Sequence, residues 1–206
     1  MKFFIHTILS HIFVIVAISF IVACKDKGID ISDGNNKTEE LENKIDSINL
    51  EIEKSYKGLE DIFVNSSLID SDKKPILLIF GRNYCKYCED LKNDIKSNEE
   101  IKNTLKENFV SYYINTSYSK EHRVGYLDKT MDTDELARHY NLTNTPLVLF
   151  LESNGNEILN MVGYNKVVFP PMIDFVLHNK AYKNEKDSKK RMQLFLDEYV
   201  KKSKNH

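Results

Sequence analysis

The 206-residue chain is long enough for one domain with extensions at its ends. Its positive and negative side chains nearly cancel, leaving a formal net charge of −2, so nucleic acid is not an expected partner. With only 4 prolines and 7 glycines, the sequence is not of low complexity.

The N-terminal residues 1–23 are predicted to be a signal peptide. Residues 8–23 are almost wholly apolar, which suits the apolar region of a signal peptide and is short for a membrane-spanning helix. The segment ends in Ile21-Val22-Ala23-Cys24, which resembles the lipobox of bacterial lipoproteins. That resemblance implies cleavage before Cys24 and lipidation of Cys24. The alternative is an uncleaved anchor, and either one exports the domain to a compartment where disulfide chemistry operates.

Two segments separate this peptide from the domain. Residues 24–37 are polar and predict a flexible tether. Over residues 38–64 apolar side chains recur at helical spacing, with Ser55 on the apolar stripe and Gly58 inside the run. The pattern predicts an amphipathic helix that packs on the domain, either continuous or broken near Gly58. A short coiled coil between two copies is the alternative.

A strand followed by two cysteines forms the centre of the chain. Residues 76–80 are apolar on both faces, as in a buried central strand. Cys85 and Cys88 follow after a short loop, and a helical pattern begins at Glu89. Cys85 is therefore expected in the first turn of a helix, where unpaired N–H groups and the helix dipole stabilise a thiolate.

A Cys-x-x-Cys pair can be redox-active, half of a zinc site, or an inert structural disulfide. A zinc site needs four ligands, but the chain has three cysteines, of which Cys24 belongs to the targeting segment. No two of its six histidines stand at ligand spacing. The pattern favours a redox pair and predicts no metal, and the other two interpretations stay open.

The second half of the chain alternates between helices and strands. Hydrophobic spacing predicts a helix over 99–107, a strand over 109–114, an inserted loop over 115–131, and a strand over 147–151. The loop is a candidate for partner contacts, with a loop of no role as the alternative. Before the last of these strands, Asp132 with Glu135 forms a capping-box signature that predicts the start of a helix.

The last part of the chain is predicted to form a hairpin and two helices. Asn154-Gly155 predicts a turn into a strand over 157–162, and a helix follows over 168–182. Residues 184–206 predict an extra amphipathic helix. Its basic face could contact anionic lipid, although the acidic residues mixed into it favour a solvated face.

This order of elements resembles the thioredoxin superfamily. The chain shares the family's run into its cis-proline and its closing hairpin, here Ala137, Tyr140, Leu142, Thr145, Pro146, Asn154-Gly155 and Val162-Gly163. The resemblance implies an α/β three-layer sandwich with a central mixed sheet over residues 65–183, extended by helices at both ends. Exported thioredoxin-like proteins of bacteria, including those of sulfur-oxidation clusters, are the most similar group.

The resemblance also implies roles for residues of the site. Cys85 would be the nucleophile, and Cys88 would resolve the mixed disulfide. Pro146 corresponds to the cis-proline that faces the sulfurs, so the backbone of Thr145 is expected to bind a substrate chain. An ordinary trans turn at Pro146 is the alternative.

Several positions near the cysteines depart from thioredoxin itself. Ile79 replaces a buried acid, so protons must reach or leave Cys88 through water or another group. Tyr84 replaces a tryptophan, and Lys86-Tyr87 replaces Gly-Pro. Lys86 is expected to help hold negative charge on Cys85, or is simply solvated. Tyr84 and Tyr87 are expected to form a rim around the sulfurs, or only to pack.

The sequence thus predicts a thioredoxin-like thiol–disulfide oxidoreductase, lipid-anchored in the cell envelope and facing the periplasm or extracytoplasmic side. Its expected partners are disulfides or thiols of exported proteins and a membrane electron donor such as a thiol-reductant transporter. No cofactor is expected beyond the redox-active disulfide. The prediction that the protein reduces the disulfides of its partners, and does not form them, rests on family analogy. An oxidase or isomerase with the same site, and a non-catalytic lipoprotein that binds a partner or haem-maturation client, are the alternatives.

Overall fold

The computed structural model describes residues 33–204. The predicted signal peptide, Cys24 and most of the predicted tether lie outside this range. The chain divides into two units, Met1–Lys44 and Ile45–His206, and the second unit contains the sheets and the cysteine pair. Within residues 33–204, no helix is both long enough and apolar enough to cross a membrane.

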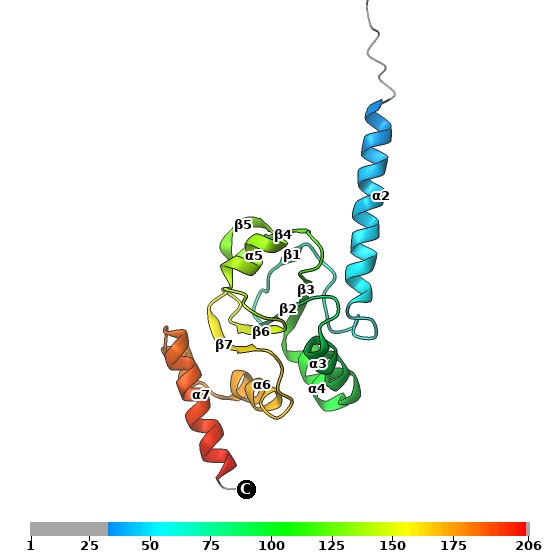
Figure 1. Cartoon of the computed structure of the whole chain (residues 1–206). Helices are drawn as coiled ribbons and strands as arrows, with labels where there is room; N and C mark the ends of the chain where they lie inside the picture. The colour runs from blue at the N-terminus through cyan, green and yellow to red at the C-terminus, as the bar shows by residue number, and fades with distance from the viewer. Residues whose placement is uncertain (1–32, 205–206) are drawn as a thin grey trace, which may run out of the picture. The chain divides into compact units, whose positions relative to one another are not determined.

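A four-stranded mixed sheet lies at the centre of the second unit (Figure 1). Strand β2 (Ile76–Gly81) is central and pairs in parallel with β3 (Val110–Asn115). On its other side it pairs antiparallel with β6 (Leu147–Leu151), which pairs antiparallel with β7 (Glu157–Val162). All six residues of β2 are buried, as its apolar sequence predicts.

Helices cover both faces of this sheet. Leu77 and Ile79 of β2 belong to a core cluster shared with α3 (Lys86–Ser97), α4 (Glu99–Asn108) and α6 (Phe169–His178). The alternate β2 residues belong to a second cluster, which includes Leu136 of α5 (Thr133–His139). Because side chains of a strand alternate between faces, one strand contributes to both cores. The predicted three-layer α/β sandwich is confirmed.

The inserted loop predicted over 115–131 is instead part of a second sheet. Strands β1 (Leu68–Ile69), β4 (Glu121–Val124) and β5 (Lys129–Asp132) pair in the order β1-β4-β5, with the short 3-10 helix η1 (Gly125–Leu127) between the last two. The burial of β4 alternates along the strand, with His122 and Val124 inside. This signal spans only four residues, too few to distinguish a strand from a polar loop by sequence.

The helix predicted over 38–64 differs at both ends. Helix α2 spans Asp33–Lys54, so it includes the last residues of the predicted tether. Residues 55–62 form turns, and Gly58 has a φ of 82°, a left-handed conformation that a right-handed helix cannot contain. Leu59 is fully buried although it lies outside the helix. The apolar spacing thus marked Leu59 and Ile62 as buried, but not their conformation. Leu41 and Ile45 of α2 are 58% and 49% exposed, so the predicted packing of this stripe on the domain is wrong at these two positions.

The C-terminal elements agree with the predicted pattern except at their ends. The turn at Gly155 and the capping box of Asp132 with Glu135 are both present. The helix expected over 168–182 ends at His178 and is followed by the 3-10 helix η2 (Ala181–Asn184). Helix α7 (Ser188–Ser203) follows, and its Phe195 is buried in the same cluster as α6.

Candidate redox site

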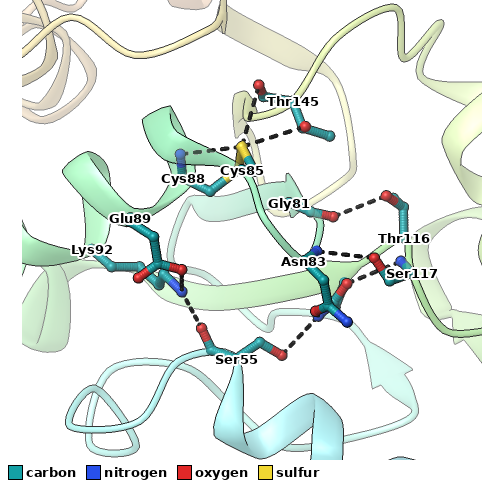
Figure 2. Close-up of a disulfide and its surroundings, with 11 residues drawn as sticks. Ser55, Gly81, Asn83, Cys85, Cys88, Glu89, Lys92, Thr116, Ser117 and Thr145 are labelled. Atoms are coloured by element: carbon teal, nitrogen blue, oxygen red, sulfur yellow. Dashed lines mark hydrogen bonds and ion pairs between the residues drawn. A yellow bond between two sulfur atoms is a disulfide. The ribbon is translucent and has the colours of Figure 1, made fainter.

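Cys85 lies where the chain passes from β2 to α3 (Figure 2). It is the N-cap residue of α3, and the N–H of Cys88 donates to its Sγ at 3.2 Å. The two cysteines form a disulfide with an S–S distance of 2.09 Å. Cys85 retains 6% of its surface exposed, whereas Cys88 is fully buried. Cys85 is therefore the sulfur that a partner can reach.

Thr145 and Pro146 face this sulfur from the loop before β6. The Thr145–Pro146 peptide bond is cis, as the family resemblance implied. The carbonyl oxygen and the hydroxyl oxygen of Thr145 each lie 3.5 Å from Cys85 Sγ. The proline loop and the cysteine pair are thus adjacent, while a substrate-binding role for Thr145 stays a prediction.

The three remaining predicted site residues surround the disulfide on the surface. Tyr84 has a φ of 57°, and its side chain is fully exposed. Tyr87 is 56% exposed, and Lys86 is exposed at the first position of α3. The exposure of both tyrosines argues against a packing role. A rim formed by the tyrosines and a charge effect of Lys86 stay predictions.

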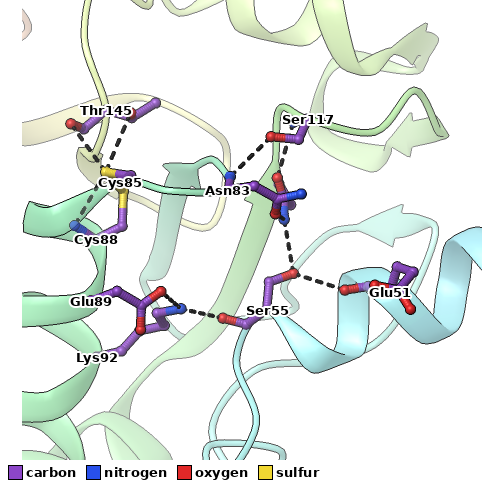
Figure 3. A network of polar contacts seen from close by, with 10 residues as sticks. Glu51, Ser55, Asn83, Cys85, Cys88, Glu89, Lys92, Ser117 and Thr145 are labelled. Carbon is purple, nitrogen blue, oxygen red and sulfur yellow. Dashed lines mark hydrogen bonds and ion pairs between the residues drawn. A yellow bond between two sulfur atoms is a disulfide. The ribbon is translucent and has the colours of Figure 1, made fainter.

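A polar network that the sequence did not reveal holds the loop before Cys85 (Figure 3). Asn115 at the end of β3 donates through Nδ2 to Asn83 Oδ1 at 2.8 Å and to Ser55 Oγ at 3.0 Å. The backbone N–H of Asn83 donates to Ser117 Oγ at 2.9 Å. These bonds connect the cysteine loop to β3 and to the turn after α2, so they fix the approach to Cys85.

A buried lysine lies one turn of α3 beyond Cys88. The side chain of Lys92 is 7% exposed, and its ammonium donates to the carbonyl oxygen of Ser55 and pairs with Glu89 at 2.7 Å. It also lies 5.6 Å from the ring centroid of Tyr113. Burial, aided by the negative charge of Glu89, raises the pKa of Tyr113, so its phenol stays protonated. The single sequence signal for this cluster was Ser55, a polar residue on an apolar stripe.

The position that carries an acid in thioredoxin is apolar here. Ile79 is fully buried within the core cluster. The ionisable pair nearest in sequence to Cys88 is Glu89–Lys92 of α3. Among the side chains of residues 33–204, no three of His, Cys, Asp or Glu cluster closely enough to hold a metal ion.

Comparisons with known proteins place this geometry in a family. A family model described as a thioredoxin-like domain matches residues 65–169, about half of the chain. A thioredoxin-fold protein from Helicobacter pylori is 35% identical with a TM-score of 0.66, and the match covers 74% of this chain and 98% of that one.

Two further solved structures also match. A thioredoxin from Thermus thermophilus is 19% identical with a TM-score of 0.42, over 54% of this chain and 80% of its own. The DsbH oxidoreductase is 18% identical with a TM-score of 0.41, over 53% and 76%. A search of curated proteins found no match.

The family model covers the observed site. The matched region contains the strand that leads to the cysteines, both cysteines, and the cis-proline. The H. pylori protein aligns over nearly its whole length. The chain therefore belongs to the thioredoxin-like family.

Proposed function

We propose that this protein is a thiol–disulfide oxidoreductase of the cell envelope that reduces disulfides of exported proteins through Cys85 and Cys88. The observation that carries the proposal is the position of Cys85. Its sulfur lies at a helix N-terminus, accepts a backbone N–H bond, and faces the cis-proline loop. Backbone donors and the positive end of the dipole of α3 favour a thiolate there.

The reaction takes place in two exchange steps. The Cys85 thiolate attacks one sulfur of a client disulfide, which breaks the client S–S bond, forms a mixed disulfide and releases one client sulfur as a thiol after protonation. Cys88 then attacks Cys85 Sγ, and its proton goes to the second departing client sulfur. The client gains two electrons and two protons, and the protein becomes the Cys85–Cys88 disulfide. A dithiol donor at the membrane must reduce it again.

The different burial of the two sulfurs supports this division of roles. Cys88 is fully buried, so a client disulfide cannot reach it directly. It can attack a mixed disulfide on Cys85 because the two sulfurs are already within bonding distance. Since Ile79 offers no carboxylate, proton transfer at Cys88 takes place through the departing client sulfur or water.

The cysteine variants test the chemistry. Insulin-disulfide reduction with dithiothreitol as donor is expected to be lost in Cys85→Ser. Cys88→Ser is expected to accumulate a mixed disulfide with its client that dithiothreitol releases. Unchanged insulin reduction by Cys85→Ser would refute the assignment. The redox equilibrium with glutathione gives the reduction potential of the Cys85–Cys88 pair. A potential close to that of strong oxidants would favour an oxidase or isomerase over a reductase.

Membrane attachment is the second part of the proposal, and the sequence ending in Cys24 supports it. In cells fed a labelled fatty acid, the full chain is expected to carry label and to fractionate with membranes. Cys24→Ala is expected to lose the label. Label on the Cys24→Ala chain would contradict lipidation at this residue.

A further inference from the structure

A charged cavity of about 520 Å³ lies beside the cysteine pair. It is open to solvent and is lined by the end of α2 and the turn after it, by the loop that precedes Cys85, and by one side of α3. Figure 3 shows part of this lining at Glu51, Ser55, Asn83, Glu89 and Lys92. Its volume lies within the roughly 300–1,000 Å³ of typical ligand sites. Its lining is mainly polar, which suits a charged ligand and not an apolar one.

The cavity is basic although the chain as a whole is slightly acidic. Five basic and two acidic side chains line it, whereas the full chain has a net charge of −2. Both acids are already paired, Glu51 with Lys54 and Glu89 with Lys92. The remaining three cations therefore determine the sign of its potential.

Those three cations are Lys57, Arg82 and Lys96, and they come from three separate segments. All are exposed, and no ion pair within residues 33–204 includes any of them. Glu60 lies near Lys96 but forms no ion pair with it, and its carboxylate accepts the N–H of Gly58 at 2.8 Å. That hydrogen bond first, and then the charge of Lys96, lowers the pKa of Glu60. Three cations on separate segments, none of them in an ion pair within residues 33–204, leave positive charge available to a ligand.

The cavity reaches the residues next to the two cysteines in the chain, Tyr84 before Cys85 and Glu89 after Cys88. Tyr84 lines it and is the residue before Cys85, so the two Cα atoms are about 3.8 Å apart. Its wall is also held in place, because Lys92 bonds to Ser55 and the network of Asn83 fixes the loop. A ligand attached to Cys85 can therefore place its neighbouring groups in a cavity whose walls are already ordered.

We propose that this cavity binds the carboxylate side chains of an acidic segment next to the disulfide of a client polypeptide. The inference rests on the proposed function and adds the class of client: disulfides flanked by Asp or Glu. The cations would attract such a segment from solution and hold it while Cys85 attacks. Their effect is electrostatic and exposed to solvent, so it depends on salt.

The test compares two peptides that contain the same disulfide, one flanked by Asp and Glu and the other by Ser and Gln. The full chain is reduced, freed of dithiothreitol and mixed with each peptide, and the second-order rate constant for a single turnover is measured. At about 10 mM salt, where the Debye length is about 30 Å, the acidic peptide is expected to react about tenfold faster. At 0.5 M salt the difference is expected to disappear.

Charge-reversal variants locate the effect. Lys57→Glu/Lys96→Glu is expected to abolish or invert the ratio of acidic to neutral rates. The control is Lys73→Glu/Lys74→Glu, which changes the net charge by the same amount. Both lysines are exposed in the loop before β2, at the end of the strand away from the cysteines, so this variant is expected to keep the ratio of acidic to neutral rates.

The outcomes separate the inference from the proposed function. Equal rates for both peptides, or an equal loss of the ratio in both variants, would overturn the cavity as a binding site while leaving the oxidoreductase proposal intact. Failure of the reduced chain to react with either peptide would overturn the oxidoreductase proposal itself.

Discussion

At the scale of single residues, the site depends on polar contacts around two sulfurs of unequal exposure. Cys85 makes contact with Thr145 and keeps a small exposed area, while Cys88 is enclosed. The groups beneath them, Lys92 and Tyr113, come from α3 and β3 and form a buried cation–aromatic contact. Ile79, at the position in β2 where thioredoxin has a buried acid, is fully buried and carries no charge.

Replacing Lys92 tests its structural part in the site. Lys92→Met keeps the apolar stem but removes the ammonium, and with it the bond to the Ser55 carbonyl and the ion pair with Glu89. A buried group left without its partner costs about 1–3 kcal/mol, and we expect the free energy of unfolding in urea to fall by that amount. The exposed control Lys73→Met is expected to stay within about 0.5 kcal/mol of wild type. Equal values for both variants would show that the ammonium does not stabilise the fold.

Because His122 is buried, we expect the fold to lose stability in acid. Its ring is 4% exposed, Nε2 lies 3.2 Å from Thr133 Oγ1, and Nδ1 has no protein partner within the described structure. Burial first, and then the charge of Lys120, lowers its pKa to about 4 from 6.5, with Asp132 opposing the shift. Below pH 6.5 the unfolded chain therefore binds the proton that the folded chain excludes.

This difference in proton binding lowers the stability of the fold as the pH falls. The contribution of His122 to stability is complete above about pH 6.5 and is lost as the pH falls toward 4, by about 3 kcal/mol in total. Urea unfolding at pH 7 and pH 4.5 measures it. In His122→Gln, which cannot titrate, the difference between the two pH values is expected to shrink by most of that amount. An unchanged difference would mean that other groups cause the acid sensitivity.

At the scale of elements, the turn of the β6–β7 hairpin packs against the second sheet. Gly155 has a φ of 83°, and a Cβ at this position would lie 2.2 Å from the ring of Tyr126 in η1. The turn therefore needs glycine for its backbone conformation and also for its contact with the second sheet. The Asn-Gly signal predicted the first requirement only.

A pair of glycine variants separates these two requirements. Gly163 has a φ of 80° but would place its Cβ in open space, so Gly163→Ala is expected to cost about 1 kcal/mol for the backbone alone. Gly155→Ala must also displace Tyr126 and is expected to cost about 1–3 kcal/mol more. Chemical denaturation of both variants gives the comparison. Equal costs would show that the ring of Tyr126 moves away freely.

At the scale of the whole molecule, the C-terminal helix is part of the core although the family match ends at residue 169. Phe195 of α7 stacks edge to face with Phe175 of α6 at 5.6 Å. Arg191, only 3% exposed, donates to the carbonyl oxygens of Glu185 and Glu157 and pairs with Glu152 at 3.2 Å. Helix α7 is thereby attached to β7 and to the end of β6.

Replacing Arg191 is expected to weaken the whole second unit. Arg191→Met removes three part-buried bonds and leaves the carboxylate of Glu152 without its cationic partner, so the loss in unfolding free energy is expected to be about 3 kcal/mol. Lys190→Met, on the exposed side of the same helix, is expected to change it by no more than about 0.5 kcal/mol. A two-step unfolding curve in the arginine variant would instead indicate that α7 detaches by itself.

Some features could be predicted because they depend on neighbours in the chain. The fully apolar run of β2, the capping box at Asp132 and the bounds of β6 and β7 all follow local rules, and all are observed. The second sheet was missed because its strands have only two to four residues, and because β1 pairs with β4 across more than fifty residues of chain. The interruption near Gly58 could be predicted because glycine favours a left-handed turn, but the end of α2 at Lys54 and the burial of Leu59 beyond it depend on the tertiary structure.

The sequence alone determined that two thiols follow a buried strand at the start of a helix, because strand periodicity, Cys spacing and helix pattern are local properties. Only the tertiary structure decided what surrounds those thiols. Ser55, Asn115 and Lys92 lie far apart in the chain, and no local pattern indicates that they meet at the cysteine loop. The same folding brings Lys57, Arg82 and Lys96 around one cavity. Long-range packing creates that charge pattern, since it depends on which turns face one another.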